Sequence, residues 1–349
     1  MAWKKLNEYA KIWEKPVLGS VDQKDGKRYM ALCIDPESKN PYKGIARQII
    51  KREGNPDIPS FLDKSKLILV ESHNLLKWDI IGDLNIKRLQ ETIQSLEENG
   101  KEFIGLEDPD ILVDKNGKKH VYFSIAFKYK GRDGYDVYVG HAEGNSLESL
   151  KATEPVLGKV NSEIVGFKEI CPIPLKNESM RFVLAETFVD KGGERKYSAI
   201  SVSKCRNLSE KWDYQKLVHD PEKEIKNWCA GHSSPCRIFD PNYLSHNKYF
   251  VGIMNGREPT KKIDGKKLYG KFRPGLFLFD NKHENIVWVD DEPLLEDPIA
   301  TTITFASELV TLNKKEAILY AQINDSFVRA YKINLEKIKE RLPKVSLYN

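Results

Sequence analysis

Residues 74–78 of the chain read Asn-Leu-Leu-Lys-Trp, and residues 207–212 read Asn-Leu-Ser-Glu-Lys-Trp. A weaker copy without the tryptophan, Asn-Ser-Leu, lies between them at residues 145–147. The copies are spaced by about 66 residues on average, which divides the 349-residue chain into close to five units. Repeats of this length, each with several strands, are typical of a propeller of four-stranded blades.

The sequence between these copies consists mainly of short runs of aromatic and β-branched residues. Residues 66–70 read Lys-Leu-Ile-Leu-Val, residues 120–124 His-Val-Tyr-Phe-Ser, and residues 249–253 Tyr-Phe-Val-Gly-Ile. Gly, Pro, Asn, Asp or Lys bound each run, a pattern that predicts many short strands joined by turns. Closing such sheets into a ring protects their edges. We therefore predict an all-β fold, a five-bladed β-propeller.

The strand runs group into five predicted blades, at about residues 16–82, 104–157, 167–217, 230–291 and 302–333. Residues 16–19 are expected to complete the last blade and close the ring. Two segments, 42–52 and 86–98, carry apolar residues at helical spacing and predict short helical insertions. Since no flexible linker interrupts the pattern, residues 1–349 are expected to form a single domain.

Composition and charge narrow the class of protein. Hydrophobic residues make up 40% and charged residues 31%, as in ordinary globular proteins. The formal net charge of +5 is too weak to predict a nucleic-acid partner. No run is long and apolar enough for a membrane helix, so no membrane partner is predicted. The N-terminus lacks a signal-peptide pattern, and the five cysteines form no Cys-x-x-Cys pair. These features predict free thiols and a cytoplasmic location.

Residues 105–110, Gly-Leu-Glu-Asp-Pro-Asp, gather three carboxylates at the start of the second predicted blade. Crowding of Glu107, Asp108 and Asp110 raises the pKa of one of them, which is how a carboxyl group is kept protonated as a general acid. An alternative reading of the same residues is a solvated acidic turn. The local sequence is compatible with both.

Other polar residues occupy matching points of the later blades. Lys168 and Glu169 open the third blade, and His232 opens the fourth. Each residue alone has an ordinary explanation as part of a turn or loop, but the set indicates a shared pocket in the channel. The chain has no Gly-rich nucleotide loop, no His-Glu-x-x-His motif and no Gly-x-Ser-x-Gly motif, and its histidines are scattered singly. We therefore predict neither a cofactor nor a metal.

These motifs resemble those of glycoside hydrolase family 130, five-bladed propeller enzymes that act on β-mannosides. Residues 105–109 are similar to the Gly-x-Glu-Asp-Pro motif of the family, and residues 168–184 to its Lys-Asp segment and the strand that follows. Residues 254–256 lie where the family has Tyr-His-Gly, and residues 305–325 resemble its last blade. The Asn-Leu-x-x-Trp turns are shared with family 43. The resemblance spans roughly residues 16–333.

The chain departs from the family pattern where basic residues are expected. Asp110 follows Glu-Asp-Pro where the family has Arg, and Glu186 lies where many members have Arg. Because members that use phosphate hold it with basic residues, these changes favour hydrolysis over phosphorolysis. Lys128, Lys130 and Arg132 lie near the equivalent loop and are the candidate phosphate ligands if phosphorolysis is retained.

The resemblance implies a carbohydrate-active enzyme that cleaves β-mannosides or similar oligosaccharides with inversion. It implies that Asp108 is the general acid, acting through a sugar hydroxyl, with Glu107 raising its pKa. An inverting hydrolase needs a second carboxylate to activate water, and Glu169 and Glu186 are the candidates. The residues expected to bind the sugar are Asp110, Lys168, His232, Asn255 and Asp325. The alternatives are a mannoside phosphorylase that uses inorganic phosphate and a non-catalytic propeller that binds glycans or another protein.

Overall fold

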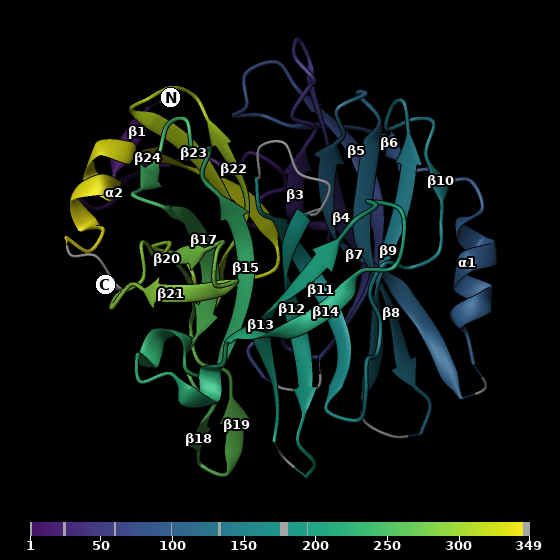
Figure 1. Cartoon of the computed structure of the whole chain (residues 1–349). Coiled ribbons are helices and arrows are strands. Elements are labelled where there is room, and N and C mark those ends of the chain that lie inside the picture. The colour runs from purple at the N-terminus through teal and green to yellow at the C-terminus, as the bar shows by residue number, and fades with distance from the viewer. Residues whose placement is uncertain are drawn as a thin grey trace.

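The protein is described by a computed structural model that covers residues 2–23, 26–58, 61–98, 100–131, 134–174, 181–193 and 195–344. Five groups of antiparallel strands are arranged around a common centre as the blades of a β-propeller (Figure 1). A single parallel bridge between Ser65 and Gly105 joins the first two blades into one sheet. The fold class predicted from the repeat is therefore confirmed. No helix within these ranges is long and apolar enough to cross a membrane.

Each blade contains four or more strands, which follow one another from the centre of the ring outward. Blade one contains β3 (Arg28–Ile34), β4 (Tyr42–Glu53), β5 (Leu62–Ser72) and β6 (Asp79–Asp83). Blade two contains β7 (Lys101–Val113), β8 (Lys119–Tyr129), β9 (Tyr135–Gly144) and β10 (Lys151–Ala152). Blade three contains β11 (Ile164–Pro172), β12 (Arg181–Asp190), β13 (Lys196–Cys205) and β14 (Asp213–His219).

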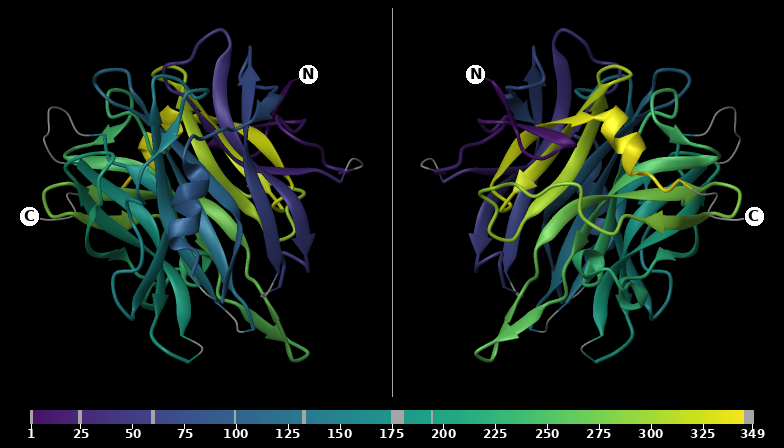
Figure 2. Two further views of the ribbon diagram at one scale, coloured as in Figure 1. Left: turned by 90° about the vertical axis from the view of Figure 1, so that its right-hand side faces the viewer. Right: turned by 90° about the vertical axis from the view of Figure 1, so that its left-hand side faces the viewer.

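The last two blades complete the ring. Blade four contains β15 (His232–Ile238), β17 (Tyr249–Arg257), β20 (Phe272–Asp280) and β21 (Asn285–Val289), with β16 (Ser245–His246) beside β17. Blade five contains β22 (Thr304–Thr311), β23 (Glu316–Ile323), β24 (Phe327–Asn334), β2 (Ala10–Trp13) and β1 (Trp3–Lys5). A hairpin of β18 (Lys261–Ile263) and β19 (Lys266–Leu268) projects from blade four (Figure 2). The short 3-10 helices are Pro221–Lys223 and Asn227–Cys229, and the α-helices are α1 (Leu89–Leu96) and α2 (Leu335–Arg341).

The ring closes at its centre and at its edge. The first strands contact one another in the order β3, β7, β11, β15 and β22, and β22 returns to β3. At the edge, β1 and β2 extend blade five by pairing with β24, and Leu18 bridges to Val328. Closure therefore uses more of the N-terminal segment than the predicted residues 16–19. The expectation of a single domain over the whole chain stays a prediction.

The core lies between facing blades, in one apolar layer for each neighbouring pair. Strand β23 illustrates why the strands read as continuous apolar runs. Ile318 and Tyr320 pack against blade one, whereas Leu319 and Ala321, on the opposite face, pack against blade four. Because successive side chains of a strand point to opposite faces, a strand covered on both sides must be apolar throughout. All five cysteines are buried and are present as free thiols.

The prediction of a helix at residues 42–52 is wrong, because these residues form β4. Ile45 and Ile49 are buried and Ile50 is 64% exposed. Residues four apart share a face of a strand as well as of a helix, so this spacing did not distinguish the two. Ile50 lies at a bulge, where the pairing with β5 passes from Ile49 to Lys51. The helix predicted within 86–98 is confirmed as α1.

The repeated segments at residues 74–78, 145–147 and 207–212 are turns that connect the third and fourth strands of blades one, two and three. In two of them the asparagine side chain accepts backbone hydrogen bonds, from Leu76 and Lys77 at Asn74 and from Ser209 at Asn207. The buried Trp78 and Trp212 follow these turns. The repeat therefore reflects a local turn that asparagine stabilises, ending in a tryptophan that anchors the fourth strand.

In every blade the innermost strand has a register shift in its pairing with the second strand, and these shifts lie at corresponding positions around the ring. The register shifts lie between Met30 and Cys33, Glu107 and Asp110, Lys168 and Ile170, Pro235 and Arg237, and Ala306 and Glu308. Ala31, Asp108 and Glu169 have positive φ at these breaks, with values of 48°, 45° and 46°. Bulges re-aim side chains, and here they turn polar groups toward the centre.

Below the breaks, a buried ion network joins the first strands. Arg237 Nη1 lies 2.5 Å from Asp110 Oδ2, and Arg237 Nε lies 2.7 Å from Glu308 Oε1. The other oxygen of Glu308 accepts a hydrogen bond of 2.9 Å from the backbone N–H of Ile34. These contacts connect blades two, four, five and one through a single guanidinium group.

Arg237→Met leaves Asp110 and Glu308 buried without their cation. Removing one partner of a buried ion pair costs about 3–5 kcal/mol, so the free energy of unfolding in urea should fall by that amount. The control is Arg195→Met, which removes an exposed pair with Glu222 and should leave the free energy of unfolding close to that of the wild type. Equal, small losses for the two variants would contradict a stabilising role for the network.

Candidate active site

A cavity of about 720 Å³ lies above the breaks in the first strands. All five first strands contribute to its lining, through Met30, Asp108, Glu169, His232 and Phe305. A cavity of this size accommodates a small oligosaccharide or another ligand of similar volume. The polar side chains converge at its floor, whereas aromatic rings such as Phe61 and Phe272 form part of its wall.

Lys168 is the centre of the charged cluster at the floor. Its Nζ lies 3.6 Å from Asp108 Oδ2, 3.4 Å from Glu169 Oε1 and 4.0 Å from Glu186 Oε1. Burial would lower the pKa of Lys168, but the surrounding carboxylates outweigh burial and raise it well above its usual value. The ammonium group therefore stays charged and holds three predicted site carboxylates around one point.

The environments of Glu169 and Glu186 move their pKa values in opposite directions. Burial, with the charges of Glu186 and Asp108, raises the pKa of Glu169 well above its usual value despite Lys168. Burial alone would also raise the pKa of Glu186, but His232 and Lys168 outweigh it and hold that pKa below its usual value. His232 Nε2 lies 3.2 Å from Glu186 Oε2. Paired groups with separated pKa values are typical of acid–base chemistry.

Arg47 is a site residue that the sequence analysis missed. Its Nη2 lies 2.5 Å from Glu107 Oε1 and its Nη1 lies 3.4 Å from Asp108 Oδ1. Burial raises the pKa of Glu107, and the charge of Asp108 adds to that effect against the pull of Arg47. Arg47 was missed because residues 42–52 were predicted to be helical, whereas β4 points this side chain into the channel.

Asp325 lies at the blade-five side of the cavity, among residues that also escaped the sequence analysis. Gln322 Nε2 donates to Asp325 Oδ1 over 3.1 Å, and Gln322 Oε1 accepts from the backbone N–H of Ala31 over 2.8 Å. Arg52 donates to Asp63 and to the backbone oxygen of Asp325. Gln322 lies two residues before Asn324, and nothing in the local sequence indicates that its side chain contacts blade one.

Several predicted site residues do not line this cavity. Asp110 lies below it, in the ion network with Arg237. Asn255 is buried, and its side-chain amide exchanges two hydrogen bonds with the backbone of Ala306. Lys128 and Lys130 are not part of the cavity lining. Arg132 lies outside the described residues.

Arg257 supplies a cationic group to the cavity wall that the prediction did not include. Its guanidinium carbon lies 4.3 Å from the ring centre of Tyr269 and 5.4 Å from that of Phe272. Its Nε is buried and makes no hydrogen bond within the described part of the chain. An arginine held by two rings, with a donor still unused, is suited to binding a polar or anionic ligand group.

No family model matches the chain, and no curated protein matches its sequence. Solved structures do resemble it. One is a β-1,2-mannobiose phosphorylase from Listeria innocua in complex with β-1,2-mannobiose, with a TM-score of 0.68, 12% identity and coverage of 96% of this chain and 98% of that one. Another is MPT-4, a mannose phosphorylase from Leishmania mexicana in complex with a phosphate ion, with a TM-score of 0.58, 14% identity and coverage of 99% and 93%.

A third similar structure comes from the GH130 family of mannoside phosphorylases, a family that contains glycoside hydrolases that target β-1,2-mannosidic linkages in Candida mannan. Its TM-score is 0.64, its identity is 13%, and the match covers 96% of this chain and 91% of that one. At these identities the likeness establishes a shared fold. The resemblance to glycoside hydrolase family 130 noted in the motifs therefore extends to the architecture of nearly the whole chain.

The pKa of Asp325 gives a pH-dependent test of the site. Burial raises this pKa to about 6, above the value of about 3.9 for an unfolded aspartate. Between these values the folded state binds more protons, so its free energy of unfolding decreases as the pH rises. Asp325→Asn should reduce this decrease by about 2–3 kcal/mol between pH 4 and pH 6 in urea unfolding. The surface variant Asp79→Asn should keep the wild-type slope, and a wild-type slope in Asp325→Asn would contradict the assignment.

Proposed function

We propose that the chain is a carbohydrate-active enzyme that hydrolyses a β-mannoside or a similar oligosaccharide with inversion of configuration. The observation that carries this proposal is the placement of Asp108, Glu169 and Glu186 around Lys168 at the floor of a large cavity. Hydrolysis with inversion requires one group that gives a proton and another that takes one from water. The cluster offers carboxyl groups for both tasks, whereas a binding protein does not require them.

Asp108 is the proposed proton donor. Its Oδ2 lies 3.6 Å from Lys168 Nζ and makes no hydrogen bond to the residues that the structure describes, so this oxygen retains hydrogen-bonding capacity for a sugar hydroxyl. The donor role follows the resemblance to family 130, in which the proton passes through a hydroxyl of the sugar. Asp108 gives its proton to that hydroxyl, and the hydroxyl gives its own proton to the leaving oxygen as the glycosidic bond breaks. Arg47 and Glu107 hold the carboxyl group in position.

Glu186 is the proposed base. A general base must be ionised, and the lowered pKa of Glu186 meets that requirement, whereas the raised pKa of Glu169 favours its protonated form. Glu186 takes a proton from a water molecule, and the resulting hydroxide bonds to the anomeric carbon from the face opposite the leaving group. Glu169, to which Ser234 donates a hydrogen bond, is proposed to bind a sugar hydroxyl.

Phosphorolysis is the second candidate, and Arg257 is the observation that favours it. Arg47 and Lys168 are already paired with carboxylates at the cavity floor, whereas Arg257 lies at the wall between two aromatic rings. A phosphate dianion among those carboxylates would meet like charges in a poorly solvated site. Water carries no such penalty, so the charge distribution supports hydrolysis.

Asp108→Asn should abolish proton donation and retain the shape of the side chain. General acid catalysis contributes about 10²–10⁴-fold, so kcat on a mannoside substrate should fall by at least that factor while KM changes little. Glu169→Gln is the comparison within the cluster and should raise KM more than it lowers kcat. The exposed variant Asp213→Asn should keep wild-type kinetics. A larger loss of kcat in Glu169→Gln than in Asp108→Asn would reverse the assignment of the acid.

The dependence of turnover on inorganic phosphate distinguishes hydrolysis, phosphorolysis and sugar binding without catalysis. Turnover of a panel of β-mannosides should proceed in phosphate-free buffer and release the free sugar, with no sugar phosphate when inorganic phosphate is added. Product analysis by mass spectrometry reads this out, and NMR of the first-formed anomer tests inversion. Turnover only with phosphate would establish the phosphorylase alternative. Saturable sugar binding without turnover in either buffer would establish a glycan-binding propeller.

A further inference from the structure

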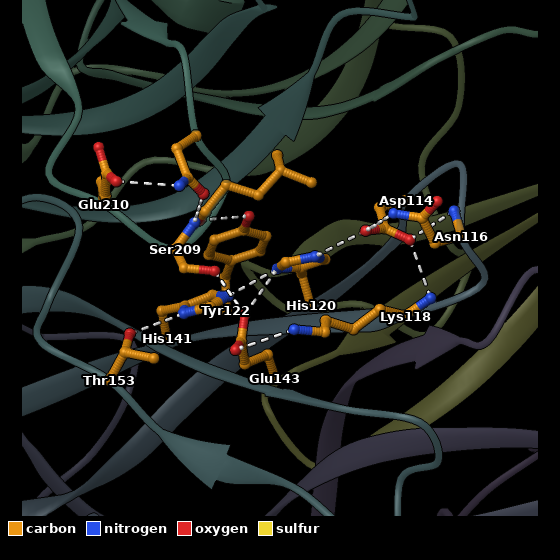
Figure 3. A network of polar contacts seen from close by, with 12 residues as sticks. Asp114, Asn116, Lys118, His120, Tyr122, His141, Glu143, Thr153, Ser209 and Glu210 are labelled. Atoms are coloured by element: carbon orange, nitrogen blue, oxygen red, sulfur yellow. Dashed lines mark hydrogen bonds and ion pairs between the residues drawn. The ribbon is translucent and has the colours of Figure 1, made fainter.

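Two histidines and a glutamate meet on the outer part of blade two, outside the cavity lining (Figure 3). His120 lies on β8, and His141 and Glu143 lie on β9. The strand register places His120 opposite Glu143 and His141 opposite Tyr122, so the three side chains share one face of the sheet. The histidines are 21 residues apart in the sequence, which is why their single occurrence predicted no metal site.

The potential ligand atoms of this cluster lie close together. His120 Nδ1 is 3.0 Å from His141 Nε2 and 4.0 Å from Glu143 Oε2, and the three atoms all lie within 4.8 Å of one another. Two imidazole nitrogens at tetrahedral positions around a zinc ion are about 3.3 Å apart, given Zn–N distances of about 2.0–2.1 Å. The present separation therefore needs only a small opening to admit an ion.

Thr153 determines which nitrogen of His141 carries the proton. The hydroxyl of Thr153 donates to the backbone oxygen of Glu154 over 3.1 Å, so its oxygen is left to accept. His141 Nδ1 lies 2.8 Å from that oxygen and is the donor to it. A neutral imidazole carries one N–H, so His141 Nε2, which faces His120, is left with a lone pair.

Asp114 has the corresponding effect on His120. Its Oδ2 lies 3.8 Å from His120 Nε2, a buried nitrogen that makes no hydrogen bond within the described ranges. Without an ion, His120 Nδ1 can donate to His141 Nε2 over 3.0 Å. In the other neutral tautomer of His120 the proton lies on Nε2, toward the negative charge of Asp114, and His120 Nδ1 and His141 Nε2 both present lone pairs to an ion beside the carboxylate of Glu143.

The charges beside the two histidines favour a bound cation. Glu143 Oε2 lies 4.0 Å from His120 Nδ1, and Asp114 Oδ2 lies 3.8 Å from His120 Nε2, so two carboxylates border the pair of imidazole rings. The nearest lysine, Lys118, contacts the outer oxygen of Glu143 over 3.1 Å and leaves Oε2 facing the histidines. Ser209 donates to that inner oxygen over 2.5 Å, which orients it without neutralising its charge.

We propose that His120, His141 and Glu143 bind a divalent transition-metal ion, with zinc the best match. Two imidazole nitrogens and one carboxylate oxygen form a common zinc ligand set, and the fourth position is open to water. Thr153, Asp114 and Ser209 provide the outer hydrogen bonds and charge that usually orient metal ligands. The side chain of Glu143 is 28% exposed, which gives an ion a route to the site.

The second cluster of potential metal ligands in the described residues contains His219, Glu224 and Cys229, and it has no pair of facing histidine nitrogens. His219 Nδ1 lies 2.9 Å from Ser233 Oγ, and its Nε2 lies 3.2 Å from Glu224 Oε2, so both nitrogens have partners. The thiol of Cys229 donates to the backbone oxygen of Lys226. Burial raises the pKa of this thiol well above its usual value, so it is not ready to bind a metal as a thiolate.

The proposed ion would stabilise the contact between blades two and three. Ser209 and Leu208 belong to the blade-three turn at residues 207–212, and both reach this cluster. Tyr122 donates to the backbone oxygen of Leu208 over 3.0 Å, and its ring packs on His141 and on Trp212. An ion bound to His141 and Glu143 would therefore hold in place the side chains that contact this turn.

Calorimetric titration of ZnCl₂ into tag-free full-length protein, after dialysis against EDTA, tests the proposal. One ion should bind per chain with a micromolar or lower Kd, and the Tm should rise by several degrees as zinc saturates the folded state. Glu143→Gln keeps the hydrogen-bonding shape and should weaken binding at least about 100-fold. Thr153→Val removes only the outer partner of His141 and should weaken it by about 10–100-fold. The exposed-histidine variant His73→Gln should bind as the wild type does.

A second readout does not depend on the folding of any variant. Co²⁺ bound to the wild-type protein should give the intense visible absorption of a tetrahedral site, and zinc should displace it. The proposal is overturned if the wild-type protein binds zinc no more tightly than millimolar. It is also overturned if Glu143→Gln and Thr153→Val leave the Kd unchanged, or if His219→Gln removes binding instead. None of these measurements uses glycoside turnover, so they stand or fall independently of the proposed enzymatic function.

Discussion

The break in the ladder of each innermost strand is the constraint on which the rest of the structure depends. An extra residue at these breaks turns Asp108 and Glu169 out of the regular strand geometry, with positive φ at both. Above the breaks the first strands open around the cavity, and below them Arg237 joins blades across the centre. A regular ladder would direct these side chains into the layers between blades, where apolar residues pack.

Burial gives the floor of the cavity its electrostatic character. Lys168 is in contact with three carboxylates, and Arg47 with two. Because these carboxylates are largely buried, each responds to its charged neighbours more than to solvent, and Glu169 and Glu186 move apart in pKa although both lie near the same ammonium group. The choice of Glu186 rather than Glu169 as the proposed base follows from this separation.

Blade two carries both proposed sites on different parts of the same strands. The first strand, β7, brings Glu107 and Asp108 to the cavity, whereas the outer ends of β8 and β9 bring His120, His141 and Glu143 together beside blade three. Both sites rest on the apolar layer between blades two and three, which contains Tyr122, Val139 and Phe167. Stabilising the outer contact is therefore expected to steady the position of blade two without touching the proposed reaction centre.

The sequence by itself determined the strand-rich blades, because turns and alternating burial depend on neighbouring residues. The Asn-Leu turns and the apolar runs were sufficient to predict five blades, and residues 105–110 pointed to the cavity. Asn255 and Asp110 were also proposed as sugar ligands, but their partners come from blades four and five, which no local pattern reveals. Arg47, Arg257 and the pairing of His120 with His141 appear only when strands take their register and the ring closes. Side chains distant in sequence converge through packing between blades, and only the tertiary structure decides that convergence.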